Sequence, residues 1–287
     1  MSSTQARDFE FYYDRLIELW PNPPKQSKFR TLSGVTHFLE LGCSTSPPLI
    51  LLPGANLTAA MWGDLASMMA EKFWVICPDL IGDIGKSQSI DSLKDLIGVK
   101  RWFLEFVSEL GLAEYYLAGY SYGGWLAWQL QSSLVGCQKM GLISPAGLLS
   151  YRFGFMVRCL YSIMFAKKAI VRDFYHYCAR GTHEALPELQ DRFEALLDLV
   201  SEGSKGPSNI LLPRRLSGKV IRETSVPIHV IVGNQEVMYD GRSGVMRVKR
   251  LLPSANTLLI DNGSHIIPFT HTRQIADALN GFFLGPE

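Results

Sequence analysis

The sequence predicts an α/β fold that is built on a mostly parallel sheet. Short apolar runs alternate along the chain with longer stretches whose apolar residues recur at helical spacing. The runs are apolar at consecutive positions, which is typical of strands covered on both faces of a sheet. Strands that alternate with helices of about 10–15 residues indicate parallel βαβ units. With 287 residues, 47% of them hydrophobic, the chain is long and apolar enough for a large core.

The predicted elements follow one another in a regular order. A helix at Asp8–Trp20 comes first, because apolar residues recur there at helical spacing as far as the proline-rich segment that starts at Pro21. The predicted strands are Thr36–Leu41, Leu49–Leu52, Phe73–Cys77, Tyr115–Gly119, Met140–Ile143, Ile228–Val232 and Thr257–Ile260. The predicted helices that separate or follow them are Ala60–Lys72, Lys94–Leu110, Gly124–Ser133 and Thr272–Phe283.

One segment, residues 148–212, interrupts this alternation. It has no strand pattern and is rich in aromatic residues. Two helical stretches, Tyr151–Arg180 and Pro187–Glu202, precede a linker of glycine, serine and proline that starts at Gly203. We therefore predict that residues 1–147 and 213–287 form an α/β core, and that residues 148–212 are a helical cap lying over it. The alternative is that these helices only pack on the side of the domain.

Composition excludes several classes of function. Lys and Arg number 28 and Asp and Glu 27, so the net charge of +1 gives no basic surface for a nucleic acid or an anionic membrane. The five cysteines are scattered and form no CxxC pair, which argues against a disulfide framework or a zinc site and favours a reducing cytoplasm. The first residues lack the apolar run of a signal peptide, and the uncharged stretches are interrupted by Gly, Pro and polar residues. We expect a soluble cytoplasmic protein without metal or cofactor; the oligomeric state stays open.

The strongest functional signal is the motif Gly119-Tyr-Ser121-Tyr-Gly123. A predicted strand leads into it and a predicted helix leaves it. In this context Gly-x-Ser-x-Gly places the serine on a sharp turn at the carboxyl edge of a sheet, where the start of the helix favours negative charge. We therefore predict that Ser121 is a catalytic nucleophile.

A serine hydroxyl needs a base, and the candidates are histidines. His37 and His229 lie inside predicted strands and are expected to be structural. His265 follows the last predicted strand on a loop, which can bring its side chain to the same sheet edge as Ser121. His271 lies close by, but the intervening proline and the start of a helix are expected to turn it away, so His265 is the preferred base.

The acid that orients this histidine should follow the preceding strand. Glu236 and Asp240 both lie just beyond Ile228–Val232. Glu236 is nearer to the strand end and is preferred, whereas Asp240 is the alternative and could instead cap the next helix. The resulting chain order of serine, acid and histidine is the one found in hydrolases that carry this motif.

The oxyanion of an acyl-transfer reaction needs two backbone donors. One candidate is the N–H of Tyr122, and the other is the N–H of Ala55 in the loop after an early strand. Asn56 is a candidate substrate contact, although it could equally cap the helix that follows. A segment at Gly82–Ser87 resembles a phosphate-binding loop but lacks the first glycine at the required spacing, and we interpret it as a surface turn.

These motifs, over about residues 36–285, resemble the α/β-hydrolase superfamily, and within it the bacterial carboxylesterases with a helical cap. The resemblance implies an α/β-hydrolase fold with Ser121, Glu236 and His265 as the triad, and with the Ala55 and Tyr122 amides as the oxyanion hole. Two departures stand out. Most relatives have His-Gly where this chain has Pro53-Gly54, and aspartate is commoner than glutamate as the acid.

The implied activity is hydrolysis of a small-molecule carboxylic ester or lactone through an acyl-enzyme. The aromatic cap, together with Trp62 and Trp125 as candidate binding residues, favours a bulky apolar substrate. The alternative is that these aromatics fill the core. The pattern also resembles the serine macrolide esterases, which open a macrolactone antibiotic. Thioester or carbon–carbon hydrolysis with the same triad, and a binding module without turnover, are the remaining alternatives.

Overall fold

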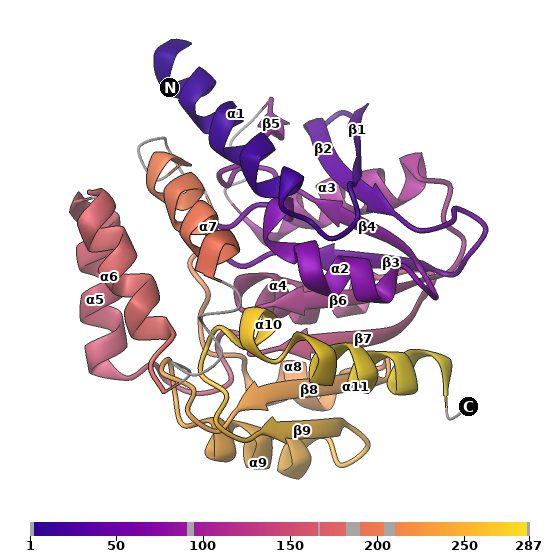
Figure 1. Cartoon of the computed structure of the whole chain (residues 1–287). Coiled ribbons are helices and arrows are strands. Elements are labelled where there is room, and N and C mark those ends of the chain that lie inside the picture. The colour runs from indigo at the N-terminus through magenta and orange to yellow at the C-terminus, as the bar shows by residue number, and fades with distance from the viewer. Residues whose placement is uncertain (1–2, 91–94, 166, 182–189, 204–209, 286–287) are drawn as a thin grey trace.

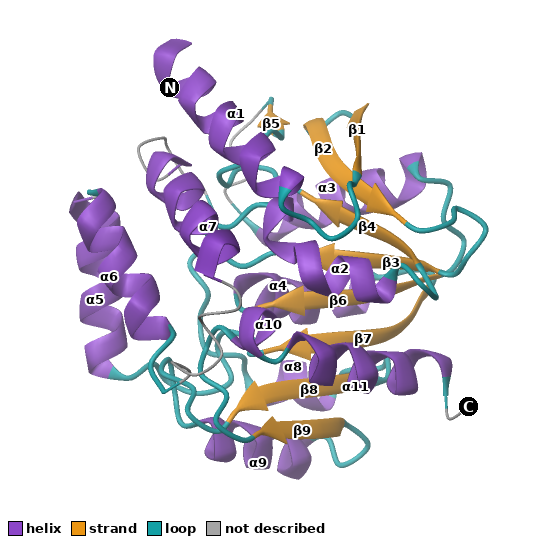
Figure 2. Ribbon diagram, viewed as in Figure 1, coloured by secondary structure: helices purple, strands orange, loops and turns teal. Residues whose placement is uncertain are grey.

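The computed structural model describes residues 3–90, 95–165, 167–181, 190–203 and 210–285, and its nine described strands form a single sheet (Figure 1, Figure 2). Eight strands follow the order β1-β2-β4-β3-β6-β7-β8-β9, and β5 pairs with β2. The strands are β1 Lys25–Arg30, β2 Gly34–Leu41, β3 Pro48–Leu52, β4 Trp74–Pro78, β5 Gln88–Ser89, β6 Tyr115–Tyr120, β7 Cys137–Ile143, β8 Ile228–Gly233 and β9 Asn256–Ile260. From β4 to β9 the neighbouring strands are parallel, which confirms the predicted α/β fold.

Two strands, β1 and β5, were not predicted. Both pair antiparallel with β2, and β1 alternates between exposed and half-buried residues in the polar sequence Lys-Gln-Ser-Lys-Phe-Arg. An edge strand of this kind is held by backbone hydrogen bonds rather than by apolar side chains, so its composition carries little signal.

Helices cover both faces of the sheet (Figure 2). One face packs against α1, α2 and α11, and the other against α3, α4, α8 and α9. The helices outside residues 148–212 are α1 Ser3–Glu18, α2 Gly63–Met69, α3 Leu96–Glu109, α4 Tyr122–Leu130, α8 Gly218–Arg222, α9 Gly241–Leu251, α10 Ile267–Thr270 and α11 Thr272–Leu284, with 3₁₀ turns η1 Ala59–Trp62 and η2 Gln131–Ser133. Because both faces of the central strands are covered, their apolar residues run consecutively, as the sequence indicated.

Three helices lie between β7 and α8, beyond the carboxyl ends of the parallel strands (Figure 1). They are α5 Phe153–Phe165, α6 Lys168–Cys178 and α7 Gln190–Gly203. The single stretch expected at Tyr151–Arg180 is therefore two helices, because Lys167 takes an extended conformation just before α6. Part of the second expected stretch, 187–189, lies outside the described residues. No helix in the described part of the chain is both long enough and apolar enough to cross a membrane.

Candidate active site

Ser121 lies on the tight turn between β6 and α4, at the carboxyl edge of the sheet. Its backbone has φ 49° and ψ −109°, a positive φ that a residue with a side chain rarely adopts. The flanking glycines make the turn possible: a Cβ on Gly119 would lie 2.4 Å from the Gly123 carbonyl oxygen, and one on Gly123 would lie 2.2 Å from that of Leu52. The two glycines thus stand where neighbouring backbone leaves no room for a Cβ, and Ser121 lies beyond the end of β6, just before α4.

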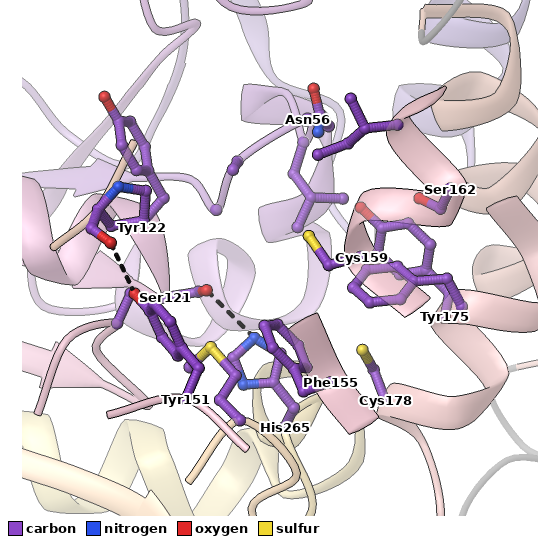
Figure 3. Close-up of a pocket in the computed structure, with 18 of the residues that line it drawn as sticks. Asn56, Ser121, Tyr122, Tyr151, Phe155, Cys159, Ser162, Tyr175, Cys178 and His265 are labelled. Atoms are coloured by element: carbon purple, nitrogen blue, oxygen red, sulfur yellow. Dashed lines mark hydrogen bonds between the residues drawn. The ribbon is translucent and has the colours of Figure 1, made fainter. Parts of the chain in front are cut away.

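The structure brings Ser121, His265 and Glu236 together in one chain of hydrogen bonds. The Ser121 Oγ lies 3.1 Å from Nε2 of His265 (Figure 3). Nδ1 of His265 lies 2.9 Å from Oε2 of Glu236. The other carboxylate oxygen of Glu236 accepts the backbone N–H of Met238 at 2.9 Å. With its proton on Nδ1, His265 leaves Nε2 free to accept the hydroxyl proton of Ser121.

The imidazole of His265 is also fixed from outside this chain of hydrogen bonds. The phenol of Tyr120 donates to the backbone oxygen of His265 at 3.1 Å, and the ring of Phe155 in α5 meets the imidazole edge-on at 6.5 Å between centroids. Burial, with added effects from Cys178 and Glu236, raises the pKa of Tyr120 well above its ordinary value, so the phenol stays a donor. The ring that carries the candidate base therefore has little freedom to turn.

The two alternatives that the sequence left open lie elsewhere. His271 precedes α11 and its Nδ1 lies 2.9 Å from the Thr270 hydroxyl. Asp240 accepts the backbone N–H of Ser243 at the start of α9 and faces Arg152 at 3.6 Å. Asp240 is thus a helix cap, the role considered for it as an alternative.

Two backbone N–H groups are available beside the serine. Those of Ala55 and Tyr122 have no hydrogen-bond partner in the described part of the chain, and both residues line the same pocket as Ser121. Tyr122 is the first residue of α4, where helix N–H groups lack an internal acceptor. The pair is therefore positioned to accept a negatively charged oxygen near Ser121.

Two aspartates brace the loop that carries Ala55. Asp83 accepts the N–H of Asn56 at 2.9 Å, and Asp79 accepts the N–H of Ala59 at 2.7 Å. Asp79 is fully buried and Asp83 nearly so, and so are their neighbours Leu80 and Ile81. Residues 82–87 form a turn, as interpreted, but not one that lies wholly at the surface: Asp83 and Ile84 are buried and the other four residues are half-buried, because the turn packs against the loop that it supports.

Ser121 opens into a pocket of about 390 Å³. Its walls come from the loop at 54–57, from α5 and α6, and from residues 210, 212 and 213. Of the described residues that line it, none has an acidic or basic side chain other than the imidazole of His265. The pocket is of the size that holds a small organic ligand, and its walls are largely apolar.

Two expected binding residues are absent from this lining. Trp62 is 1% exposed and packs edge-on against Tyr120 inside the core, and Trp125 is 3% exposed, stacks on Tyr122 and donates its indole N–H to the Arg214 carbonyl. Both predictions were wrong, because these rings fill the space behind the site. Composition near a motif does not show which way a side chain points.

Asn56, the third candidate substrate contact, lines the pocket. The capping role considered for it belongs to Thr58, whose hydroxyl accepts the Ala60 N–H at 3.2 Å. Helices α5 and α6 supply lining residues that the sequence did not single out, among them Phe155, Cys159 and Tyr175. On α5, which is apolar nearly all round, helical periodicity could not separate the pocket face from the others. α6 is amphipathic, and its apolar face, formed by Val171, Phe174, Tyr175 and Cys178, is the face that lines the pocket, so periodicity could have found it.

No group of three or more His, Cys, Asp and Glu in the described residues is arranged to hold a metal ion.

Comparison with known proteins places these features in context. The Alpha/beta hydrolase family matches residues 49–278 of the chain. An uncharacterized carboxylesterase, nap, from Bacillus subtilis is 24% identical over 275 residues, covering 94% of this chain and 90% of the relative. The carboxylesterase YbfK of the same organism is 23% identical, covering 95% and 92%. The crystal structure of naproxen esterase from Bacillus subtilis has a TM-score of 0.87, with 21% identity and 99% of each chain covered.

Proposed function

This chain belongs to the alpha/beta hydrolase family, and from this membership and the hydrogen-bonded Ser121, His265 and Glu236 we propose that it is a serine carboxylesterase. The observation that carries the proposal is the 3.1 Å contact between the Ser121 hydroxyl and a histidine nitrogen that can accept its proton. The carboxylesterase names of two relatives that align with nearly the whole chain support the same class of reaction.

The proposed reaction has two halves. The Ser121 Oγ attacks the ester carbonyl while Nε2 of His265 takes the hydroxyl proton, and the resulting oxyanion accepts the N–H groups of Ala55 and Tyr122. His265 then returns the proton to the leaving alcohol, which leaves an acyl group on Ser121. A water molecule repeats the sequence, gives its proton to His265, and releases the acid with the serine restored. Glu236 holds the imidazole in the required tautomer and stabilises its charged form.

We further propose that residues 148–212 act as a cap whose inner side receives a bulky, mainly apolar acyl or alcohol group. Phe155, Ile163 and Phe174 contribute to the wall of the pocket, and no described acidic or basic side chain lines it apart from His265. Apolar walls reward the burial of apolar surface, at about 25 cal/mol per Å². A charged acyl group would gain no ion pair with these walls.

The proposal is tested by labelling and turnover on the same preparation. A fluorophosphonate probe should modify wild type but not Ser121→Ala, and intact-protein mass spectrometry should show the acyl adduct of a slow aryl ester on Ser121. A mixed panel of short esters, aryl esters, thioesters, diketones and macrolactones then shows which class of bond is hydrolysed fastest. Oxygen esters should have the highest kcat/KM.

Other outcomes would change the proposed reaction or substrate, or reject the proposal. A thioester or a diketone that leads the panel would keep the triad and change the reaction. A macrolactone opened only by wild type would identify the bulky substrate as a macrolide. If Ser121 takes no label and nothing turns over, the chain is a binding module and the proposal fails.

A further inference from the structure

Three polar side chains stand in the otherwise apolar part of the pocket. They are Asn56 on the loop after β3, Ser162 on α5 and Tyr175 on α6. In the described part of the chain none of these three side chains has a hydrogen-bond partner. By contrast, the nearer phenol of Tyr151 donates to the Pro213 carbonyl at 3.1 Å. The three groups are therefore available to a ligand.

These groups lie away from the reacting serine. Figure 3 shows Asn56, Ser162 and the Tyr175 hydroxyl across the pocket from the contact between Ser121 and His265. A second observation places Tyr175 on the same side of the pocket as Asn56. Burial raises the pKa of Tyr175, and Cys178 and then Asp83 raise it further. Asp83 is also the carboxylate that accepts the Asn56 N–H. The Tyr175 phenol thus stays protonated and feels the charge of Asp83, near the Asn56 backbone.

The three side chains also complement one another chemically. The Asn56 amide offers two N–H donors and one acceptor oxygen, and each hydroxyl can either donate or accept. A ligand that is apolar throughout would displace water from them and leave them unpaired, which is costly in an apolar cavity. A ligand with a hydroxyl, carbonyl or ether oxygen at the matching distance would pair with them instead. Sites of this kind discriminate strongly against analogues that lack the polar group.

We propose that Asn56, Ser162 and Tyr175 form a polar subsite that selects esters with an apolar skeleton and one hydrogen-bonding oxygen remote from the ester bond. This inference rests on the proposed esterase function and names its substrate class. The backbone of Asn56 has φ 54°, so Asn56→Gly removes the amide side chain while keeping both the left-handed conformation and the N–H that Asp83 accepts. Ser162→Ala and Tyr175→Phe remove the two hydroxyls without adding bulk.

The test compares matched esters that differ by one oxygen. One series is p-nitrophenyl ω-hydroxyalkanoates of seven to ten carbons, chain lengths that do not readily cyclise to lactones, against the plain alkanoates. A second series is acetate monoesters of α,ω-diols of four to ten carbons against the plain alkyl acetates. The measured quantity is the ratio of kcat/KM for the hydroxylated ester to that for its plain partner. In wild type this ratio should reach about tenfold or more at one chain length, the value of one good hydrogen bond. Each of the three variants should lower that ratio at least threefold.

A matched control separates the subsite from general disturbance of the pocket. Ile163→Val trims an apolar lining residue of the same cap helix and should change both esters by the same factor, which keeps the ratio. A wild-type ratio near one at every length in both series, or a ratio that all three variants leave unchanged, overturns the subsite while ester turnover still stands. If no ester is hydrolysed, the esterase proposal fails separately, and calorimetric binding of the same ester pairs to Ser121→Ala decides the subsite by the ratio of their Kd values.

Discussion

The molecule contains two buried pairs of a carboxylate and an imidazole with nearly the same geometry. His265 Nδ1 lies 2.9 Å from Glu236, and His37 Nδ1 lies 2.9 Å from Asp79. In both pairs the imidazole side chain is 9% exposed and the carboxylate 0% exposed. Distance and burial do not separate them.

What separates them is the group that faces the second ring nitrogen. Nε2 of His265 faces the Ser121 hydroxyl, which can give up a proton, and it lies beside a pocket. Nε2 of His37 lies 3.1 Å from the amide oxygen of Gln26, which can only accept. A general base must have a nitrogen that accepts, so only the first pair is arranged for catalysis.

The carboxylates differ in the same sense. Asp79 also receives the N–H groups of Ala59 and Lys86 and the phenol of Tyr13, so it joins α1 to the loops after β3 and β4. Glu236 accepts one backbone N–H besides His265. We infer that the Asp79 pair mainly holds the fold, whereas the Glu236 pair mainly serves the reaction.

The largest difference between the two pairs should appear when one neighbouring hydroxyl is removed from each of them. Ser121→Ala is expected to lower kcat for an aryl ester by about 10⁴-fold or more, because the nucleophile is lost. Its melting temperature should change little, since alanine keeps the same backbone conformation and loses only the hydroxyl that contacts His265. Ser87→Ala removes the hydroxyl that donates to the Asp79 carbonyl and should change kcat by less than threefold. If kcat fell equally in the two variants, the two carboxylate–imidazole pairs would not differ in their role.

Replacing each carboxylate by its amide should give opposite profiles. Glu236→Gln is expected to lower kcat by about 10³- to 10⁴-fold with a small change in stability, because the imidazole loses the partner that fixes its tautomer. Asp79→Asn should lower the free energy of unfolding by about 3 kcal/mol, because a buried network loses acceptor sites. Urea unfolding and turnover measured on both variants test this. A stable but inactive Asp79→Asn enzyme would contradict it.

A smaller loss of activity is expected from a substitution at Asp83, whose carboxylate accepts a hydrogen bond from the loop that carries Ala55. Asp83→Asn weakens the hydrogen bond from the Asn56 N–H and so loosens the loop that presents the Ala55 N–H. We expect kcat to fall about tenfold, less than the loss of a whole oxyanion donor. KM for a short ester should change by less than threefold. A fall confined to KM would show that the loop positions substrate rather than the donor.

The smallest effect concerns a histidine without a carboxylate. His229 in β8 is half-buried, its Nδ1 has no partner among the described residues, and burial lowers its pKa below 6.5. The unfolded chain therefore binds a proton more readily, so the stability from this residue is complete above about pH 6.5 and is lost as the pH falls below it. His229→Gln should make the free energy of unfolding, measured by urea titration, fall less steeply between pH 7 and pH 5. The change in slope should correspond to less than one proton taken up on unfolding. An unchanged slope would contradict this assignment.

The sequence predicted the parallel sheet because its central strands are apolar on both faces. It also predicted which serine, histidine and acid meet, since Ser121, Glu236 and His265 each follow a strand that ends at the same edge. Chain order and parallel strands determine this placement without any knowledge of side-chain packing.

Features that depend on side-chain direction could not be predicted in the same way. Trp62 and Trp125 follow the right motifs but point into the core. The turn after Asp79 is partly buried, because the Asp79 carboxylate receives backbone N–H groups from two loops. The pocket face of α5 is hidden because that helix is apolar nearly all round, whereas α6 is amphipathic and its apolar face is the one that lines the pocket. Only the assembled structure shows that Ser162 and Tyr175 line the pocket together with Asn56.

The separation of Ser121 from its base by 144 residues has a consequence for biosynthesis. At typical translation rates of about 5–20 residues per second, the ribosome needs roughly 7–30 s to pass from the serine codon to that of His265. During that interval the growing chain holds a serine turn with no proton acceptor, and β8 and β9 are still missing from the sheet. The proposed esterase activity can therefore begin only when the last quarter of the chain has emerged and paired with the sheet.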